Sequence, residues 1–202
     1  LNEGQYFSEF SRDLHVVKPY AIPHDWRRCL TIDYGLDMLA ALWIAQSPDG
    51  HSVVYRELYR PGLIISDAAA QMLACETAGE RIDCRLAPPD LWNRRQETGR
   101  SAVELFADSG LDFVKSSNER VAGWLALHEL LMPRKDTDGA VRPRLTIFDT
   151  CRNLIRTLPA LQHDKRNPSD TANTPHELTH APDALRGYAA TVYEPPQPAP
   201  PT

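Results

Sequence analysis

Three apolar runs separated by short turns dominate the N-terminal half of the sequence. They cover residues 30–34, 38–45 and 51–59, with Gly35 after the first run and a polar turn containing proline and glycine after the second. β-branched and aromatic side chains favour strands, and consecutive strands with short connections pair as neighbours. The pattern therefore predicts an antiparallel meander whose first strand ends at a carboxylate, Asp33.

A strand–helix–strand unit follows the meander. The chain breaks at Pro61-Gly62, residues 66–79 carry apolar side chains near helical spacing, and residues 81–87 form another strand-like run. Strands joined by a crossover helix pair in parallel. Residues 81–87 are therefore expected to extend the meander as a parallel strand, which predicts an α/β protein with a mixed central sheet flanked by helices.

Apolar stripes and turn residues continue through the rest of the chain. We expect helices at 102–108, 121–131, 151–158 and 180–190, and strands at 111–114 and 145–148. Residues 134–144 place basic side chains around Asp138-Gly139, which favours a two-stranded finger. Residues 1–27 lack a sustained period and indicate an extended lead-in. The whole chain is then one domain over 1–191 with a proline-rich tail over 192–202.

Composition narrows the class of protein. A chain of 202 residues with 42% hydrophobic side chains can bury the core of one domain. Its net charge of -5 gives no global basic field, so any contact with DNA must come from a local patch. The four cysteines lack metal-site spacing and are read as reduced, buried thiols in a cytoplasm-like compartment. No apolar run approaches the roughly 20 residues of a membrane span, so we expect no membrane partner.

Three acids stand where distant parts of the chain could meet. Asp33 follows the first strand, Asp90 lies just past the strand at 81–87, and Asp183 begins the last helix. Carboxylates that share two divalent ions can activate water and stabilise a leaving oxygen, and magnesium prefers such oxygen ligands. The simpler alternatives are a turn-forming role for Asp33 and a favourable helix-start charge for Asp183. Asp37 and Glu57 are read as rim or solvated carboxylates, either of which could serve a second ion.

The histidines near the last helix offer a second kind of site. His176, His180 and Asp183 would share one helical face if that helix began early, which is a transition-metal spacing. Pro182 and the loop-like residues before His180 argue against an early start.

Seven short blocks, taken in order, resemble the C-terminal nuclease domain of terminase large subunits from tailed phages or prophages. The blocks lie at residues 4–7, 15–17, 32–35, 88–99, 115–124, 151–159 and 180–186. The first-strand block reads Ile32-Asp33-Tyr34-Gly35 and the last block contains His180-Ala181-Pro182-Asp183. The resemblance covers residues 4 to 190. It implies a ribonuclease-H-like fold, endonucleolytic cutting of concatemeric viral DNA during packaging, and an acidic cluster holding two Mg or Mn ions.

The resemblance also assigns the acids. Asp33 matches the first-strand acid and Asp183 the acid of the closing helix. Relatives often have Ala-Asp-Pro where this chain has Ala87-Pro88-Pro89, so the second acid is expected at Asp90, with Glu57 or Asp83 as alternatives. His180 would approach the metals or the scissile phosphate, or cap its helix; relatives often carry an acid directly before it, where this chain has Thr179.

Basic side chains supply candidate phosphate contacts. They are Lys115, Arg120, Arg134, Lys135, Arg142 and Arg144, the last four on the predicted finger. Solvated surface charge is the simpler interpretation of the same residues.

The phosphate-binding motif GxxxxGK[ST] of an ATPase motor does not occur in the sequence. We therefore expect the nuclease half of a longer protein, with the motor half before residue 1. By resemblance its partners are double-stranded DNA, the terminase ATPase domain, the small terminase subunit and the portal, in the cytoplasm of a bacterial host at the packaging complex. The loss of Ala-Asp-Pro and the acidic pI favour an alternative, a catalytically weak docking module that binds DNA, the portal or the motor.

Overall fold

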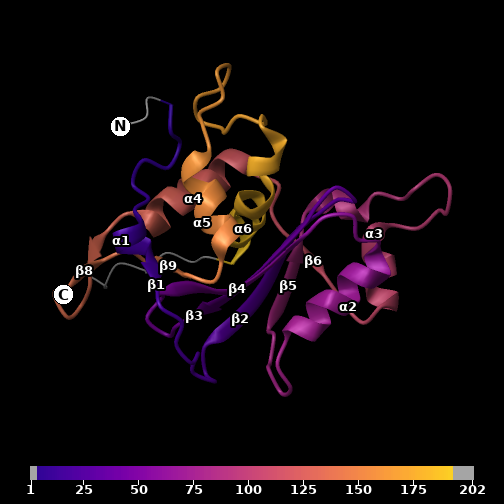
Figure 1. Cartoon of the computed structure of the whole chain (residues 1–202), viewed down its shortest axis with the longest axis horizontal. Helices are drawn as coiled ribbons and strands as arrows, with labels where there is room; N and C mark the ends of the chain where they lie inside the picture. The colour runs from indigo at the N-terminus through magenta and orange to yellow at the C-terminus, as the bar shows by residue number, and fades with distance from the viewer. Residues whose placement is uncertain (1–3, 193–202) are drawn as a thin grey trace, which may run out of the picture.

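A seven-stranded mixed sheet forms the centre of the protein in a computed structural model that describes residues 4–192 (Figure 1). Its strand order is β1-β9-β4-β3-β2-β5-β6. In that order the strands are Val16–Val17, Leu145–Phe148, Ser52–Arg60, Leu39–Gln46, Arg27–Tyr34, Cys84–Ala87 and Val114–Lys115. The pairs β2–β3 and β3–β4 are antiparallel and the remaining pairs are parallel. The predicted mixed sheet with an antiparallel meander is confirmed.

The central strand β3 explains the longest apolar run of the sequence. Seven of its eight residues are buried, and α6 packs against this strand. A strand buried on both faces reads as a continuous apolar run and not as an alternation. The register pairs Asp33 with Ala40 and Ala40 with Tyr59, so the end of β2 lies beside the start of β3 and the end of β4.

Helices cover the sheet in two groups (Figure 1). The α4, α5 and α6 helices (Arg120–Leu131, Arg152–Thr157 and His180–Thr191) lie together on one side, and α6 contacts β2 and β3. The α2 and α3 helices (Ile65–Cys75 and Ala102–Asp108) pack against one another elsewhere. The short helices are α1 (Arg12–His15), η1 (Pro89–Trp92), η2 (Leu158–Ala160) and η3 (His176–Leu178). No helix in the described part of the chain is long and apolar enough to cross a membrane.

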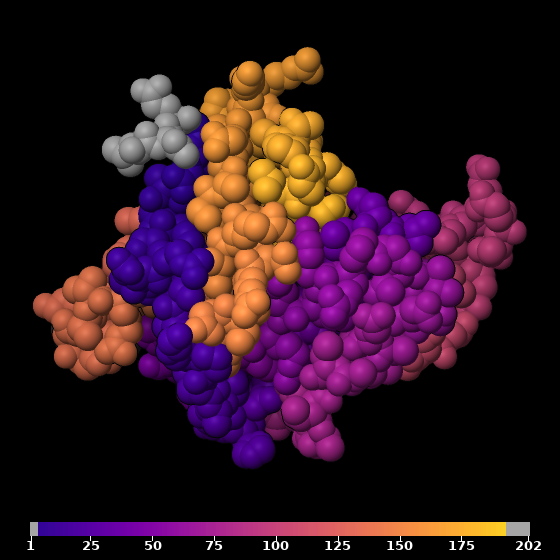
Figure 2. Space-filling view, viewed as in Figure 1, coloured from indigo at the N-terminus to yellow at the C-terminus, as the bar shows by residue number. Residues whose placement is uncertain are grey.

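The lead-in is more regular than the sequence predicts. Residues 12–15 form α1, and β1 pairs in parallel with β9 through Val16 and Ile147. Phe7 is fully buried, and the buried His15 side chain lies 2.7 Å from the Leu131 carbonyl oxygen through Nε2. The space-filling view shows this indigo segment lying along the orange segment around α5 (Figure 2). The N-terminal segment is therefore part of the core, and its two-residue strand is too short to show a period.

The predicted finger is confirmed. The β7 strand, Arg134–Lys135, pairs antiparallel with β8, Val141–Arg142, and the hairpin stands out from the body of the molecule (Figure 2). Several other elements differ at their ends. The helix expected at 66–79 ends at Cys75, the strand expected at 81–87 is Cys84–Ala87, and the strand expected at 111–114 is Val114–Lys115. The proline-rich tail predicted from residue 192 lies, apart from Val192, outside the described residues.

A buried carboxylate ties the sheet to the loop before β5. The Glu80 side chain is 0% exposed and forms ion pairs with Arg28 of β2 at 2.9 Å and Arg56 of β4 at 3.0 Å. It also accepts hydrogen bonds from the Tyr55 hydroxyl and the Thr77 backbone N–H. Burial opposes the charged form, but the bonds from Arg56, Thr77 and Tyr55 outweigh it and lower the pKa of Glu80 to about 2.

We expect Glu80→Gln to destabilise the fold by about 3 kcal/mol at neutral pH, the size of contribution that such a pKa shift represents. Because the folded pKa lies below the unfolded one, the contribution is fully present above the unfolded pKa of the carboxyl group. It is lost as pH falls towards about 2. Urea unfolding of both proteins between pH 7 and pH 3 measures the difference. The exposed Glu97→Gln serves as control, and a difference that does not narrow below the unfolded pKa would contradict the assignment.

Candidate metal centre

A contact between α6 and β2 positions the first acid. Side chains alternate along a strand, so Thr31 and Asp33 point to the same face of β2. The buried Thr31 hydroxyl donates to the Ala184 carbonyl oxygen of α6 at 2.7 Å. At Gly187, one turn further along α6, an added Cβ would lie 3.4 Å from Thr31 Oγ1. This close approach sets the first turn of α6 over the end of β2, where the Asp33 side chain is 27% exposed.

Asp183 lies in that first turn of α6 and faces two arginines. Its Oδ1 atom is 3.4 Å from Arg186 Nε and 3.5 Å from Arg120 Nη1. Burial raises the pKa of Asp183, and the negative charge of Asp33 raises it further, whereas the two arginines lower it. The net direction is upward, so the arginines do not fully offset the combined effect of burial and of the nearby Asp33 charge on the pKa of Asp183.

Asp90 reaches the same edge of the sheet from β5. The parallel register pairs Thr31 with Leu86, and Asp90 lies in η1 just after β5 ends. Burial raises the pKa of Asp90, and Asp33 again raises it through its charge. Asp33 therefore acts electrostatically on both other acids. Carboxylates with raised pKa values are suited to a bound divalent ion, because the charge of the ion would lower those pKa values.

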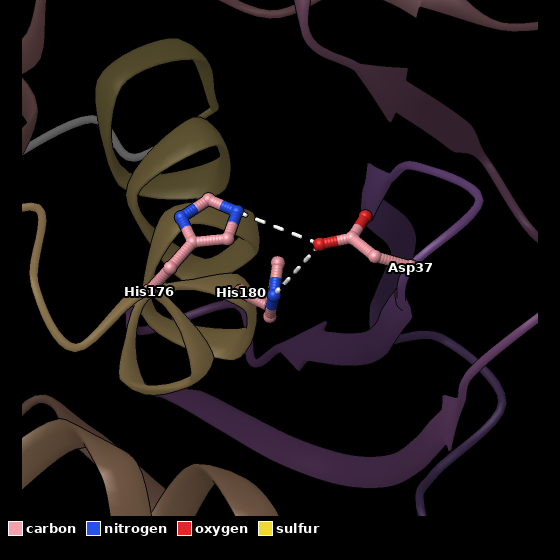
Figure 3. Close-up of side chains that lie close together, drawn as sticks. All are labelled: Asp37, His176 and His180. Carbon is pink, nitrogen blue, oxygen red and sulfur yellow. Dashed lines mark ion pairs between the residues drawn. The ribbon is translucent and has the colours of Figure 1, made fainter.

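The three acids lie farther apart than three side chains that bind a single metal ion directly. Within residues 4–192, only one group of three His, Cys, Asp or Glu side chains has ligand atoms all within 4.8 Å of one another. That group is Asp37, His176 and His180 (Figure 3). Asp33, Asp90 and Asp183 are gathered at one edge of the sheet without meeting that distance.

His180 connects this group to Asp33. Its Nδ1 atom lies 3.0 Å from Asp33 Oδ2, and its Nε2 atom lies 3.6 Å from Asp37 Oδ2. The hydrogen bond with Asp33 raises the pKa of the buried His180 ring, and the charges of Asp33, Asp37 and Asp183 act in the same direction. Of the roles expected for His180, the structure places it against the first acid and shows no side-chain cap at the start of α6.

The two alternatives for the second acid are engaged by other groups. Glu57 accepts hydrogen bonds from the Asn153 and Leu154 backbone N–H groups at 3.0 and 2.8 Å, so it caps the start of α5. Asp83 accepts a bond from the Arg28 backbone N–H at 2.9 Å, which places it at the opposite end of β2 from Asp33. The structure does not bring Asp83 to the other acids, because the site lies at the carboxyl end of β5 and Asp83 at its start.

The candidate DNA contacts fall into two sets. Lys115 pairs in register with Ala87 at the end of β5, and its Nζ lies 5.5 Å from the centre of the Trp92 ring. Arg120 is held by Asp170 at 3.1 Å as well as by Asp183. Both residues therefore lie near the acids, and Arg120 is already engaged in ion pairs.

The finger lies at the other end of the sheet. It leads into β9, whose first residue Leu145 pairs with Ser52 at the start of β4, whereas Asp33 lies beside the end of β4. Arg134 is paired with Glu129, and Arg142 with Asp136 and Asp138, all within or beside the finger. These side chains, together with Lys135 and Arg144, are thus separated from the acids by the length of β4.

Sequence reasoning missed the basic side chains of the cleft next to Asp90. This cleft of about 710 Å³ is lined by Tyr34, Asp90, Arg94 and Arg95 among others. Both arginines lie in the block at residues 88–99, so their proximity to Asp90 in the sequence was the available signal. His176 and Asp37 were not paired from sequence, since nothing local links the turn after β2 to η3.

Comparisons with known proteins give structural likeness only. Neither a family model nor a curated protein matches the chain. Among solved structures, the nuclease domain of the P22 large terminase matches with a TM-score of 0.72 over 93% of this chain and 91% of that one, at 16% identity. The fold is that of a large-terminase nuclease domain.

Two other solved relatives contain metal ions. The large-terminase nuclease of thermophilic phage G20c with bound magnesium matches with a TM-score of 0.59 at 14% identity, covering 94% of this chain and 98% of that one. The nuclease domain of the bacteriophage SPP1 large terminase with bound Mn matches with a TM-score of 0.56 at 14% identity, covering 91% and 96%.

A longer relative shows how much of such a protein the chain represents. The large terminase of a second thermophilic bacteriophage, in complex with ADP, matches with a TM-score of 0.73 at 14% identity. The match covers 94% of this chain and 45% of that one. The chain thus spans just under half the length of that relative. The ribonuclease-H-like, large-terminase nuclease fold predicted from the sequence is confirmed.

Neutralising Asp33 tests whether the three acids share one electrostatic environment. In Asp33→Asn we expect the pKa values of Asp90 and Asp183 to fall, because a negative charge that opposes their ionisation is removed. The pKa of His180 should also fall, since its charged form loses a partner. Carbon-detected NMR titration of the side chains without metal measures all three. Asp37→Asn is the control, because it should lower the pKa of His180 alone.

Proposed function

We propose that this chain is the metal-dependent endonuclease domain of a tailed-phage or prophage terminase large subunit, which cuts concatemeric viral DNA during genome packaging. The observation that carries the proposal is the convergence of Asp33, Asp90 and Asp183 at one edge of the sheet, with Asp33 raising the pKa of both partners. The likeness to terminase nuclease domains over more than nine-tenths of the chain supports it.

The proposed cofactors are two Mg or Mn ions held by Asp33, Asp90 and Asp183. Bound there, the ions would supply an activated water and charge stabilisation for the leaving oxygen of a phosphodiester. His180 fixes the Asp33 carboxylate through Nδ1, and the Thr31–Ala184 hydrogen bond holds Asp183 at the required end of β2. The residues present fit such ions, because carboxylate oxygens are the ligands that Mg²⁺ and Mn²⁺ prefer.

DNA contacts in this proposal are made to phosphates. Lys115, Arg94 and Arg95 lie on the same side of the sheet edge as Asp90, and Arg120 lies beside Asp183. Phosphate contacts carry no base information, which agrees with a cut timed by a packaging motor and not by sequence. Arg134, Lys135, Arg142 and Arg144 would contact DNA at a distance from the cut.

The further proposed partners are those of a full-length large terminase. The longer large terminase described above was solved with ADP and with ATP-γ-S, and this chain matches less than half of it, which supports an ATPase domain in the same full-length chain as the partner. By family resemblance we add the small terminase subunit and the portal, in the cytoplasm of a bacterial host at the packaging complex. The rival function is a docking module that keeps the fold, binds DNA, the portal or the motor, and cuts weakly.

Plasmid cleavage with Mn²⁺ tests the endonuclease. We expect the wild-type chain to cut and Asp33→Ala to lose at least about a hundredfold of the rate, since an ion-holding carboxylate contributes several kcal/mol of charge stabilisation. Asp67→Asn on the exposed side of α2 is the matched acid control and should cut normally. An Asp33→Ala protein that cuts as well as wild type would remove Asp33 from the site.

Calorimetry with Mn²⁺ tests whether Asp90 or Glu57 is the second metal-binding acid. Asp90→Asn should weaken Mn²⁺ binding while leaving the melting temperature nearly unchanged. Glu57→Gln should lower the melting temperature and leave Mn²⁺ binding nearly unchanged, because Glu57 caps α5 and a lost cap costs about 1 kcal/mol. Wild-type protein with no carboxylate-dependent Mn²⁺ binding would support the docking module instead.

A further inference from the structure

We infer that Asp37, His176 and His180 form a separate site for a borderline divalent ion such as Zn²⁺, next to the proposed nuclease centre and chemically distinct from it. Figure 3 shows the three side chains converging from the turn after β2, from η3 and from the start of α6. One ligand atom from each side chain lies within 4.8 Å of the other two.

The distances suit coordination better than hydrogen bonding. Asp37 Oδ2 lies 3.5 Å from His176 Nε2 and 3.6 Å from His180 Nε2. Both distances exceed the range of a normal N–H···O hydrogen bond. They are close to the edge of about 3.3 Å that a tetrahedral site has when its metal–ligand bonds are about 2.0–2.1 Å long.

The orientation of His180 is already that of a metal ligand. Its Nδ1 atom is engaged by Asp33 at 3.0 Å, which leaves the Nε2 lone pair directed at Asp37 and His176 when Nδ1 carries the proton. Ligating histidines almost always donate their other ring N–H to a carboxylate or carbonyl, which fixes the tautomer. Asp33 fills that role here, and His180 is only 7% exposed, so the ring has little freedom to turn away.

The other two ligands are held by their surroundings. The Thr179 hydroxyl donates to the His176 carbonyl at 2.8 Å, and the Tyr59 hydroxyl donates to the Glu177 carbonyl at 3.2 Å, which fixes η3 against the end of β4. The Asp37 side chain folds back over Gly35, where an added Cβ would lie 2.6 Å from Asp37 Oδ1. The site is thus assembled by glycine at 35 and by backbone contacts of η3, with no contribution from Asp90 or Asp183.

The donor set defines the ion class. Two imidazole nitrogens and one carboxylate oxygen suit Zn²⁺, Co²⁺ or Ni²⁺ and not Mg²⁺, which takes oxygen ligands. The side chains of His176 and Asp37 are 70% and 60% exposed, so the ion would be accessible from solvent and keep a position for water. Binding would fasten the β2–β3 turn to η3. The inference does not depend on nuclease activity, although the two sites share the His180–Asp33 hydrogen bond.

Cobalt absorption and zinc calorimetry on the 202-residue chain test this site. We expect one Co²⁺ to give visible d–d bands, to be displaced by Zn²⁺ and to persist in excess Mg²⁺. His176→Asn should weaken Zn²⁺ binding at least tenfold, because even the loss of a residue that only supports a metal ligand costs about 10–100-fold in affinity. Mn²⁺-dependent plasmid cleavage should be retained. This exposed side chain can be replaced without loss of the fold, and a melting curve verifies that.

Two controls decide the outcome. His24→Asn, an exposed histidine elsewhere, and Asp183→Asn, in the proposed nuclease centre, should both retain Zn²⁺ binding. Wild-type Zn²⁺ affinity in His176→Asn, displacement of Co²⁺ by Mg²⁺, or loss of Zn²⁺ in Asp183→Asn would each overturn the site. Absence of plasmid cleavage with intact Zn²⁺ binding would instead count against the nuclease proposal alone.

Discussion

The hydrogen bond from Thr31 to the Ala184 carbonyl is the contact on which the site depends. It is buried and joins the strand that carries Asp33 to the helix turn that carries Asp183. Each of the two acids is a near neighbour in sequence of one bonded residue. A polar contact in the core, reinforced by the small residue at Gly187, therefore sets the separation of the two carboxylates that we propose as metal ligands.

Gathering the acids has an electrostatic cost that the surrounding residues partly offset. Arg186 and Arg120 face Asp183, and Arg186 also lies over the Trp124 ring at 5.3 Å. One terminal nitrogen of Arg186, Nη1, is buried without a hydrogen-bond partner in the described part of the structure, which costs about 1–3 kcal/mol. Gly123 makes room for this arginine, because an added Cβ would lie 2.6 Å from Arg186 Cγ. A glycine in α4 and a guanidinium nitrogen without a hydrogen bond are therefore the cost of keeping positive charge beside the partly buried Asp183.

The local sequence pattern predicts the meander and most helices correctly, because these elements are long enough to show a hydrophobic period. The β2 to β4 strands have eight or nine residues each, and short turns connect them, so their apolar runs and turn residues are readable. The β1 strand has two residues, and its partner β9 is far away in the sequence, so no period could reveal it. Asp33, Asp90 and Asp183 could be proposed from strand ends and resemblance. The Asp37–His176 pairing could not, because it requires knowing that η3 folds back onto the turn after β2.

The basic residues show why net charge is a poor guide to the DNA contacts that we propose. Arg134 and Arg142 are paired with acids of the finger or of adjacent α4, and that finger lies roughly 20 Å along β4 from the Asp33 edge. Arg94, Arg95 and Lys115 lie instead on the elements that surround Asp90. In the proposed function a phosphate near the Asp33 edge would be held by this small local set, although the net charge of the chain is -5. Because screening confines surface charges to a range of about 10 Å, the residues next to the site decide the approach and the total charge does not.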